Sequence, residues 1–324
     1  MTSETDSHSH SRGCSDDEIE RLFERLNSLK EGAQAATELV NCGQRAVEPL
    51  RRFLLDGQLS GIFQPRQRAV EALAELGAKD VLIEYLTTEK HISDPVARYG
   101  EEAVEGTAAR LLAEWRDEGV YQILLRLLRQ RALPGLIDAV AGFRRPEAIP
   151  EFITALGDSI GRSFAEEALA RLGEAAQRAL VETARTPLPS VDHETPTSLC
   201  RRRSSLRLLA ELALSAEDLR LLSRLADDRD TEIAARASRI VLAARDGNEQ
   251  RRAAGRLITM LPDAPWFLQI EIEGWLLERA SIALIAVDEE IAAQRRAIDE
   301  GRFTDNLLLR LLSLKHKIEK RQRT

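Results

Sequence analysis

The sequence predicts an all-α protein, in the form of a right-handed α-solenoid of helical pairs with capping helices at both ends. Two observations lead to this prediction. Hydrophobic residues make up 44% of the chain but aromatic residues only 4%, so the core must consist mainly of Leu, Ala, Ile and Val. Ala and Leu favour helices, and runs of β-branched residues are scarce. Similar amphipathic segments also recur along the chain, which is typical of helical repeat proteins.

The length of 324 residues is more than one compact domain usually holds. A repeat array escapes this limit because each unit buries its apolar face against its neighbours. We expect a disordered polar tail over residues 1–14, the repeat array over residues 15–263, and a C-terminal helical cap over residues 264–324. Ser15 and Glu18 form a predicted capping box at the start of the first helix.

Five segments carry the repeat, and each consists of an amphipathic helix, a short break and a second amphipathic helix. Aligning the segments gives a basic period of about 30 residues, with two insertions of about ten. Gly77 and Gly173 stand where the first helix of a segment should end, as C-cap glycines do. One position of the first helix is expected to be buried in every segment: Leu73, Leu111, Val140, Leu169 and Leu209.

The helices EALAELG and EALARLG and the segment PEAIPEFITALGD carry a resemblance to a known family. They resemble the short HEAT-like repeats of the phycobilisome-lyase type, over roughly residues 33–246. Such repeats occur in bilin lyases, in HEAT-fold DNA glycosylases and, most commonly, in protein-binding scaffolds. The resemblance therefore implies an armadillo-like architecture but no single activity, and no catalytic motif of these families can be placed on residues of this chain.

The repeat pattern fades from about residue 264, where we expect three further helices. The first is rich in aromatic residues and lies around residues 266–277, and the other two cover about residues 284–300 and 304–321. Apolar residues of the last helix follow a heptad-like step and should face one side. They are Leu307, Leu311, Leu314 and Ile318.

The formal net charge of −7 argues against generic nucleic-acid binding, which needs a positive surface facing the phosphates, although a local basic patch remains open. Cys14, Cys42 and Cys200 lack the paired spacing of a metal site and are expected to be free thiols in a reducing compartment. Neither a signal peptide nor an apolar segment long enough to span a bilayer is apparent. We therefore expect a cytoplasmic protein.

Two insertions interrupt the repeat, one from Thr87 to Gly100 and one from Thr186 to Cys200. In the alignment both fall at the same place in the unit, the turn within a helical pair, and should emerge on one rim of the solenoid. Loops carried on a rigid scaffold often bind partners. An insertion rich in Pro, Ser and Thr is more typical of a disordered excursion. Both interpretations stay open.

Each insertion contains a histidine beside acidic residues, His91 in the first and His193 in the second. A shared metal site fails on distance, because three repeats at about 10 Å per helical layer separate the two by roughly 30 Å. Zinc ligands must lie within about 2 Å of the ion. We therefore expect two solvated histidines, and no metal or other cofactor.

Four arginines open the helix after the second insertion. Arg201, Arg202, Arg203 and Arg207 either bind the carboxylates or phosphates of a partner, or form a solvated face paired with Glu211 and neighbouring acids. The abundance of nearby acids favours the solvated face.

The three tryptophans are expected in the core. Trp115 and Trp275 lie in apolar helical patterns. Trp266 and Phe267 either pack in the core or form an exposed aromatic anchor for a partner, since tryptophan is enriched at interface hot spots. The surrounding apolar residues favour the core.

The sequence contains no G-x-S-x-G, H-E-x-x-H, P-loop or G-x-G-x-x-G motif. It therefore favours a non-enzymatic scaffold that binds another protein through the solenoid groove or the loop rim. Two alternatives remain: a bilin-lyase-like enzyme or chaperone that holds a tetrapyrrole in the groove, and a HEAT-fold DNA glycosylase or DNA-binding module. The candidate partner-binding residues are His91, His193, Arg201, Arg202, Arg203, Arg207, Trp266 and Phe267.

Overall fold

The structure, a computed structural model, describes residues 14–244, 246–300 and 307–323. Within these residues the protein is all-α, with eighteen α-helices that pack in sequential pairs and no strand. The all-α prediction is therefore confirmed. The chain divides into two compact units, Met1–Glu151 and Phe152–Thr324, at a boundary that the sequence did not predict.

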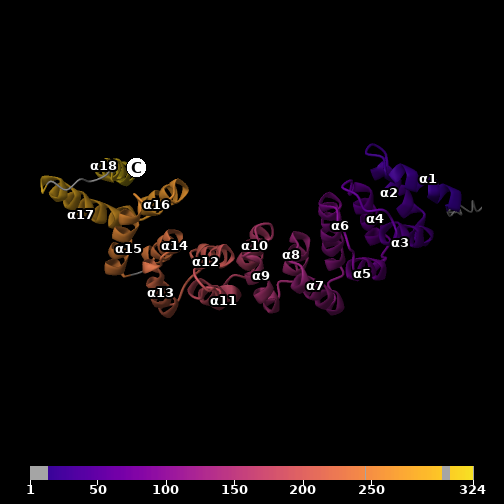
Figure 1. Cartoon of the computed structure of the whole chain (residues 1–324), viewed down its shortest axis with the longest axis horizontal. Helices are drawn as coiled ribbons and strands as arrows, with labels where there is room; N and C mark the ends of the chain where they lie inside the picture. The colour runs from indigo at the N-terminus through magenta and orange to yellow at the C-terminus, as the bar shows by residue number, and fades with distance from the viewer. Residues whose placement is uncertain (1–13, 245, 301–306, 324) are drawn as a thin grey trace, which may run out of the picture. The chain divides into compact units, whose positions relative to one another are not determined.

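In the N-terminal unit the even-numbered helices α2, α4, α6 and α8 pack against one another in chain order, and α3, α5 and α7 pack beside them (Figure 1). Neighbours in sequence are thus neighbours in space, as short connections require. The elements of this unit are α1 (Asp16–Leu26), α2 (Gly32–Asn41), η1 (Gly43–Ala46), α3 (Val47–Leu55), α4 (Gln64–Glu75), α5 (Lys79–Thr87), α6 (Pro95–Ala113), α7 (Glu118–Gln130), α8 (Pro134–Ala141) and η2 (Pro146–Ala148). Helix α9 (Ile149–Ala155) crosses the boundary between the units.

The C-terminal unit repeats this arrangement. Its even-numbered helices from α10 to α18 pack against one another in chain order, α11 and α13 pack beside them, and α15 packs against α17. Its elements are α10 (Arg162–Leu172), α11 (Glu174–Arg185), α12 (Pro196–Leu209), α13 (Ala216–Ser223), η3 (Arg224–Asp227), α14 (Thr231–Leu242), α15 (Gly247–Met260), α16 (Trp266–Glu278), α17 (Ala280–Asp299) and α18 (Leu307–Arg323).

Ion pairs join successive even-numbered helices of the C-terminal unit. Each pair places a cation of one helix against a carboxylate of an adjacent even-numbered helix, so that charges which lose water on packing regain a partner. The pairs are Arg207 with Glu166, Arg203 with Glu232, Arg236 with Glu271, and Arg310 with Glu273.

The predicted core position is buried in four of the five segments. Leu73, Val140, Leu169 and Leu209 are all at most 1% exposed. Leu111 is only half-buried, and its neighbour Leu112 is fully buried instead. The prediction for Leu111 is therefore wrong by one residue. The buried stripe of α6 steps by four residues, through Val104, Ala108 and Leu112, and leaves Leu111 to one side.

The predicted helix ends are largely confirmed. Gly77 and Gly173 follow α4 and α10 with φ of +71° and +56°, a left-handed conformation that glycine adopts without strain. Ser15 caps α1 by accepting a hydrogen bond from the Glu18 N–H at 3.3 Å, which is one half of the predicted capping box. No helix in the described part of the chain is long and apolar enough to cross a membrane.

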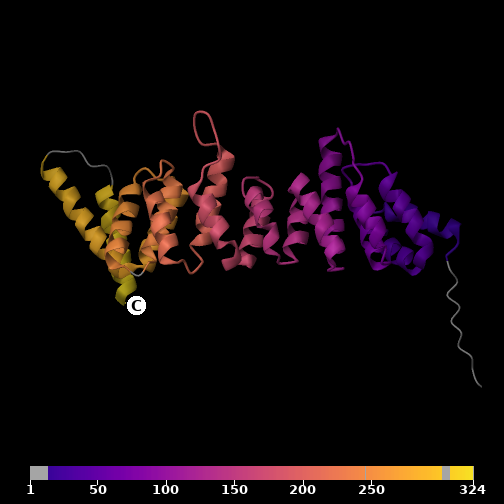
Figure 2. The same ribbon diagram turned by 90° about the horizontal axis from the view of Figure 1, so that it is seen from below.

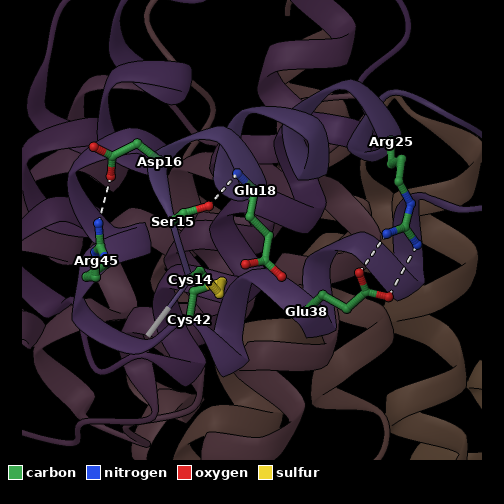
Figure 3. The surroundings of a disulfide bond; sticks show 8 residues. All are labelled: Cys14, Ser15, Asp16, Glu18, Arg25, Glu38, Cys42 and Arg45. Carbon is green, nitrogen blue, oxygen red and sulfur yellow. Dashed lines mark hydrogen bonds and ion pairs between the residues drawn. A yellow bond between two sulfur atoms is a disulfide. The ribbon is translucent and has the colours of Figure 1, made fainter. Parts of the chain in front are cut away.

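A disulfide joins Cys14 to Cys42, next to the capped start of α1 (Figure 3). The prediction of three free thiols is therefore wrong for this pair, and only Cys200 is free. The turn from α1 into α2 brings the two Cα atoms to 5.2 Å, within the usual range for a disulfide. This pairing removes one reason for expecting a reducing compartment. Residues 1–13 of the predicted tail lie outside the described residues.

The last two helices lie close to the positions predicted from the sequence. Helices α17 and α18 match the two predicted at 284–300 and 304–321, and Leu311, Leu314 and Ile318 of the expected stripe are buried. Residues 301–306 between them lie outside the described residues. Trp275 is in the core at 7% exposed, as predicted, whereas Trp115 follows the end of α6 and is half-buried.

Candidate partner-binding surfaces

The first insertion is shorter than predicted. Residues 88–94 form the connection between α5 and α6, but residues 95–100 belong to α6. The Asp94 carboxylate caps this helix by accepting a hydrogen bond from the Ala97 N–H at 2.9 Å. Pro95 follows at the first helical position, where its missing N–H costs nothing. The Asp-Pro pair therefore starts a helix inside the predicted loop.

The second insertion follows the same rule. Residues 186–195 connect α11 and α12, and residues 196–200 are already helical. Thr195 is the N-cap, its side chain accepting from the Ser198 N–H at 3.3 Å, and Pro196 is the first helical residue. Figure 2 shows this loop extending beyond the ends of α11 and α12. The two insertions thus occupy equivalent connections, each from the second helix of one predicted pair to the first helix of the next. The prediction that they lie in the turn within a pair is therefore wrong. They belong to different units, so a shared rim stays a prediction.

The first loop is held by Lys90. Its Nζ lies 2.8 Å from Glu105 Oε1 and 3.1 Å from Glu101 Oε1, and 3.6 Å above the centre of the Tyr85 ring. Both carboxylates lie on α6 and are only 2% exposed. The loop is therefore an ordered segment anchored by its lysine, rather than a disordered excursion.

Glu101 is the centre of this buried cluster. The Arg66 Nε lies 2.9 Å from Glu101 Oε2, and the Tyr85 O–H donates to Glu101 Oε1 at 2.7 Å. Burial by itself raises the pKa of Glu101, but the bonds from Arg66 and the charge of Lys90 outweigh it, so the net shift is downward. Burial and the Glu101 charge raise the pKa of Tyr85. The cluster therefore keeps an ionised carboxylate inside the repeat.

A half-enclosed pocket of about 330 Å³ lies beside the first loop. Lys90, His91, Glu105 and Arg131 contribute to its lining, and the Arg131 Nη2 lies 2.9 Å from Glu105 Oε2. His91 itself is exposed. Because Lys90 and Arg131 are both paired with Glu105, these charged groups of the pocket stabilise the loop.

The second loop is held by Glu194. Its Oε2 lies 2.6 Å from Arg202 Nη1, and Arg202 is only 3% exposed. Arg202 also pairs with Asp228 at 2.5 Å and donates from Nε to the Ala184 carbonyl oxygen at 2.9 Å. All three contacts lie inside the protein. The prediction of a solvated face is therefore wrong for Arg202, which is a buried structural arginine.

The other three arginines also have internal partners. Arg203 pairs with Asp230 and Glu232, and Arg207 lies 3.3 Å from Glu166. Arg201 donates from Nε to the Ile153 carbonyl oxygen at 3.2 Å, and burial lowers its pKa. The predicted acidic partner is also different, because Glu211 pairs with Arg239. These contacts commit most of the arginine cluster to helix packing.

Trp266 and Phe267 are exposed and do not pack in the core, so the favoured prediction is wrong. Trp266 is 74% exposed, Phe267 41% and Ile270 62%. The two rings meet edge to face, with centroids 6.4 Å apart. Helix α16 is held in place by its opposite side, where Leu268, Ile272, Trp275 and Leu276 are buried. We refer to Trp266, Phe267 and Ile270 as the α16 patch.

The glycine of α16 lies along the same face. Gly274 follows Ile270 by one helical turn, and a Cβ placed on it would have no neighbour within 4 Å. A mid-helix glycine costs about 1 kcal/mol relative to alanine. No contact in the described structure accounts for that cost, so the surface is open beside Gly274.

His193, like His91, is exposed, and the two lie in different units. Among the described residues no group of three or more His, Cys, Asp or Glu side chains is arranged to hold a metal ion.

No model of a known protein family matches the chain, and no curated protein matches it either. Among solved structures, a similar chain belongs to the complex of CpcE and CpcF of phycocyanin lyase from Nostoc sp. PCC7120. It has 17% sequence identity and a TM-score of 0.28, and the match covers 74% of this chain and 94% of that chain. Another belongs to computationally designed self-assembling cyclic homooligomers, with 15% identity, a TM-score of 0.14, and coverage of 90% and 94%. At these TM-scores neither likeness supports a statement about function.

Proposed function

We propose that the protein is a non-enzymatic scaffold that binds another protein. We also propose that its helical pairs form a right-handed α-solenoid of HEAT-like units, and that it acts in the cytoplasm. Sequential packing of helical pairs supports the repeat architecture. Arrays of this kind present extended surfaces to partners.

The observation that carries the binding proposal is the α16 patch. Tryptophan is enriched at interface hot spots, and large apolar side chains gathered in water mark interaction sites. Trp266, Ile270 and Gly274 are spaced by four residues and form one stripe along the helix. Because Gly274 permits close approach, the stripe fits the apolar face of a helix from the partner protein.

The test compares what the wild-type chain and a Trp266→Ala/Ile270→Ala double variant capture from an extract of the source organism, quantified by mass spectrometry. Val191→Ala is the matched control, because Val191 is an apolar residue of the second loop that is 99% exposed. We expect a protein that the wild type and Val191→Ala retain and the double variant loses. Identical captured sets for all three chains would refute the α16 patch as the binding surface.

Two direct measurements address the alternative functions. We expect no change in the absorption spectrum when the protein is mixed with a bilin, and no retention of duplex DNA at physiological salt. Either effect would contradict a purely protein-binding role.

A further inference from the structure

Two arginines of the C-terminal unit, Arg224 in η3 and Arg252 in α15, are exposed and have no carboxylate within ion-pair distance in the described part of the chain. Other arginines of this unit, such as Arg202, Arg203 and Arg236, are paired with carboxylates of neighbouring elements. On a chain with a net charge of −7, unpaired guanidinium groups at one place form a local positive site.

These two side chains line one hollow of about 270 Å³ between η3 and α15. Arg256 lines the same hollow, and its Nη2 lies 3.1 Å from Asp227 Oδ1, so that this ion pair joins the two elements. The arginines come from different elements, which pack around α14, and this packing sets their spacing. The buried part of the lining is small and mostly apolar, and consists of Ala226, Ser238, Val241 and Ala253.

The guanidinium groups are the donors that this hollow offers to a ligand. Ser223 and Ser238 also line it, but their hydroxyls already donate to backbone carbonyl oxygens at 3.0 and 2.8 Å. Arg256 uses one N–H group on Asp227 and keeps the others. The planar fork of arginine matches the oxygens of a phosphate or carboxylate. The hollow is therefore built to accept an anion.

We propose that this hollow binds one phosphate monoester group, carried by a phosphorylated side chain of a protein partner. A phosphate monoester has nearly two negative charges near neutral pH and three acceptor oxygens, which suits three arginines better than a single carboxylate does. Asp227 and Glu249 also line the hollow, and their charges disfavour a continuous polyanion such as nucleic acid. A ligand with a single oxyanion, flanked by uncharged or basic residues, is complementary to these charges.

The surface beside the hollow has room for the rest of such a peptide. A wider depression of about 730 Å³ shares Arg224 and Asp227 with it. Leu188, His193 and other residues of the second loop line this depression, together with Arg229 and the carboxylates of Asp228 and Asp230. Residues that flank a phosphorylated side chain would therefore lie against the second loop. This site is separate from the α16 patch and does not depend on the function proposed for it.

The experiment measures binding of a short fluorescent peptide, Gly-Ser repeats with one central phosphoserine, to the full-length protein by fluorescence anisotropy. Parallel titrations use the unphosphorylated peptide, the same peptide with glutamate at the centre, free O-phosphoserine and single-stranded DNA. We expect saturable binding of the phosphopeptide, weaker binding of free O-phosphoserine, and at least tenfold weaker binding of the other three probes.

Two variants locate the site. Arg224→Gln and Arg252→Gln should each weaken phosphopeptide binding by about tenfold, because each removes a charged hydrogen-bonding group. Arg178→Gln is the matched control, since Arg178 is an exposed arginine of α11 outside the hollow. Circular dichroism of each variant confirms that the fold is intact. Equal binding of phosphorylated and unphosphorylated peptides, tighter binding of DNA, or unchanged affinity in both variants would overturn the proposal.

Discussion

The two loops at 88–94 and 186–195 occupy the same kind of connection, yet charges of opposite sign hold them. Lys90 of the first loop reaches buried carboxylates of α6, whereas Glu194 of the second reaches the buried Arg202 of α12. Glu101 and Arg202 both lie at the seventh residue of their helix, after a capped start with proline at the first position. The buried residue that holds the loop is at the same position in both helices, and only the sign of its charge differs.

This difference indicates that the fold requires an ion pair between loop and helix at this position, whichever of the two residues has the positive charge. A buried ion loses its hydration, and a nearby opposite charge with hydrogen bonds compensates that loss whichever ion is on the helix. In both places the buried residue has a second ionic partner, Arg66 for Glu101 and Asp228 for Arg202. The loop residue therefore completes a cluster that the helices already hold.

The largest expected effect comes from removing the buried helix residue of each ion pair that holds a loop, Glu101 for the first loop and Arg202 for the second. Glu101→Ala leaves Arg66 buried without its carboxylate, and Arg202→Ala leaves Asp228 and Glu194 without their cation. Breaking a buried pair from one side costs about 3–5 kcal/mol. We expect a loss of this size in the free energy of unfolding for both variants, measured by urea unfolding followed by far-UV circular dichroism.

The matched controls have the same charge but no ion pair among the described residues. Glu102→Ala on α6 and Arg220→Ala on α13 should change the free energy of unfolding by less than about 0.5 kcal/mol. If only one of the two anchor variants is strongly destabilised, the two loops are not equivalent, and the comparison fails.

The effect of the N-terminal disulfide on the free energy of unfolding can be compared with that of the two ion-pair clusters. Cys14→Ser removes a bond that closes a loop with a sequence separation of 28 residues. The chain-entropy model gives a loss of about 3–4 kcal/mol for a loop of this length. The melting temperature should fall by the same amount in Cys14→Ser and in wild-type protein treated with dithiothreitol. A reductant that further lowers the melting temperature of the variant would show that another thiol contributes.

Acid should weaken the first anchor in a predictable direction. The pKa of Glu101 is lowered in the folded protein, so folding favours the ionised carboxylate. Its contribution to stability is complete above the unfolded pKa of about 4.3 and is lost as the pH falls through the lower folded pKa. Between about pH 5 and pH 2 the wild type should therefore lose more stability than Glu101→Gln, measured by urea unfolding at each pH. Parallel pH profiles would show that Glu101 does not titrate in this range.

Helix periodicity predicted four of the five buried core positions, with Leu111 wrong by one residue, but it did not predict which charged side chains are buried. Residues 101, 102 and 105 are all glutamates of α6, and local pattern cannot distinguish the half-buried Glu102 from its two buried neighbours. The burial of Glu101 is decided by Arg66, which lies 35 residues earlier in the chain. The same limitation concealed the disulfide, because Cys14 and Cys42 meet only through the packing of α1 on α2.

The α16 patch was misjudged for a related reason. Residues 266–278 are apolar on all sides, and such a helix is usually buried. One side of α16 does pack into the core, but no described element covers Trp266 and Ile270. An apolar pattern around a whole helix therefore indicates that all its sides favour contact with other apolar groups. The pattern does not show whether those groups belong to the same chain, because that depends on the tertiary structure.

A smaller effect is expected from the loop members of the anchors. In Lys90→Met, Glu101 keeps Arg66 and Glu105 keeps Arg131, and in Glu194→Gln, Arg202 keeps Asp228. Each change removes hydrogen bonds to a charged group but leaves no buried ion alone, so we expect a loss of about 1–3 kcal/mol. Hydrogen exchange should accelerate in the altered loop only. Faster exchange throughout α6 or α12 would mean that the loop residue, and not the helix cluster, holds the helix.

The smallest effect is expected at the tip of the second loop. Residues 190–193 are all exposed, and their internal side-chain contact joins Ser190 to the His193 carbonyl. Replacing these four residues with Gly-Ser-Gly-Ser keeps the loop length, so the cost of closing the loop is nearly unchanged, and the loss should be below about 1 kcal/mol. Extending the replacement through Glu194 should add the full cost of the Glu194→Gln change, because it also removes the partner of Arg202. If the tip replacement alone costs as much as the extended one, Glu194 is not the anchor. Lys90 lies near the start of the first loop and Glu194 near the end of the second. If Glu194 is not the anchor, this difference in position has no effect on how the two loops are held.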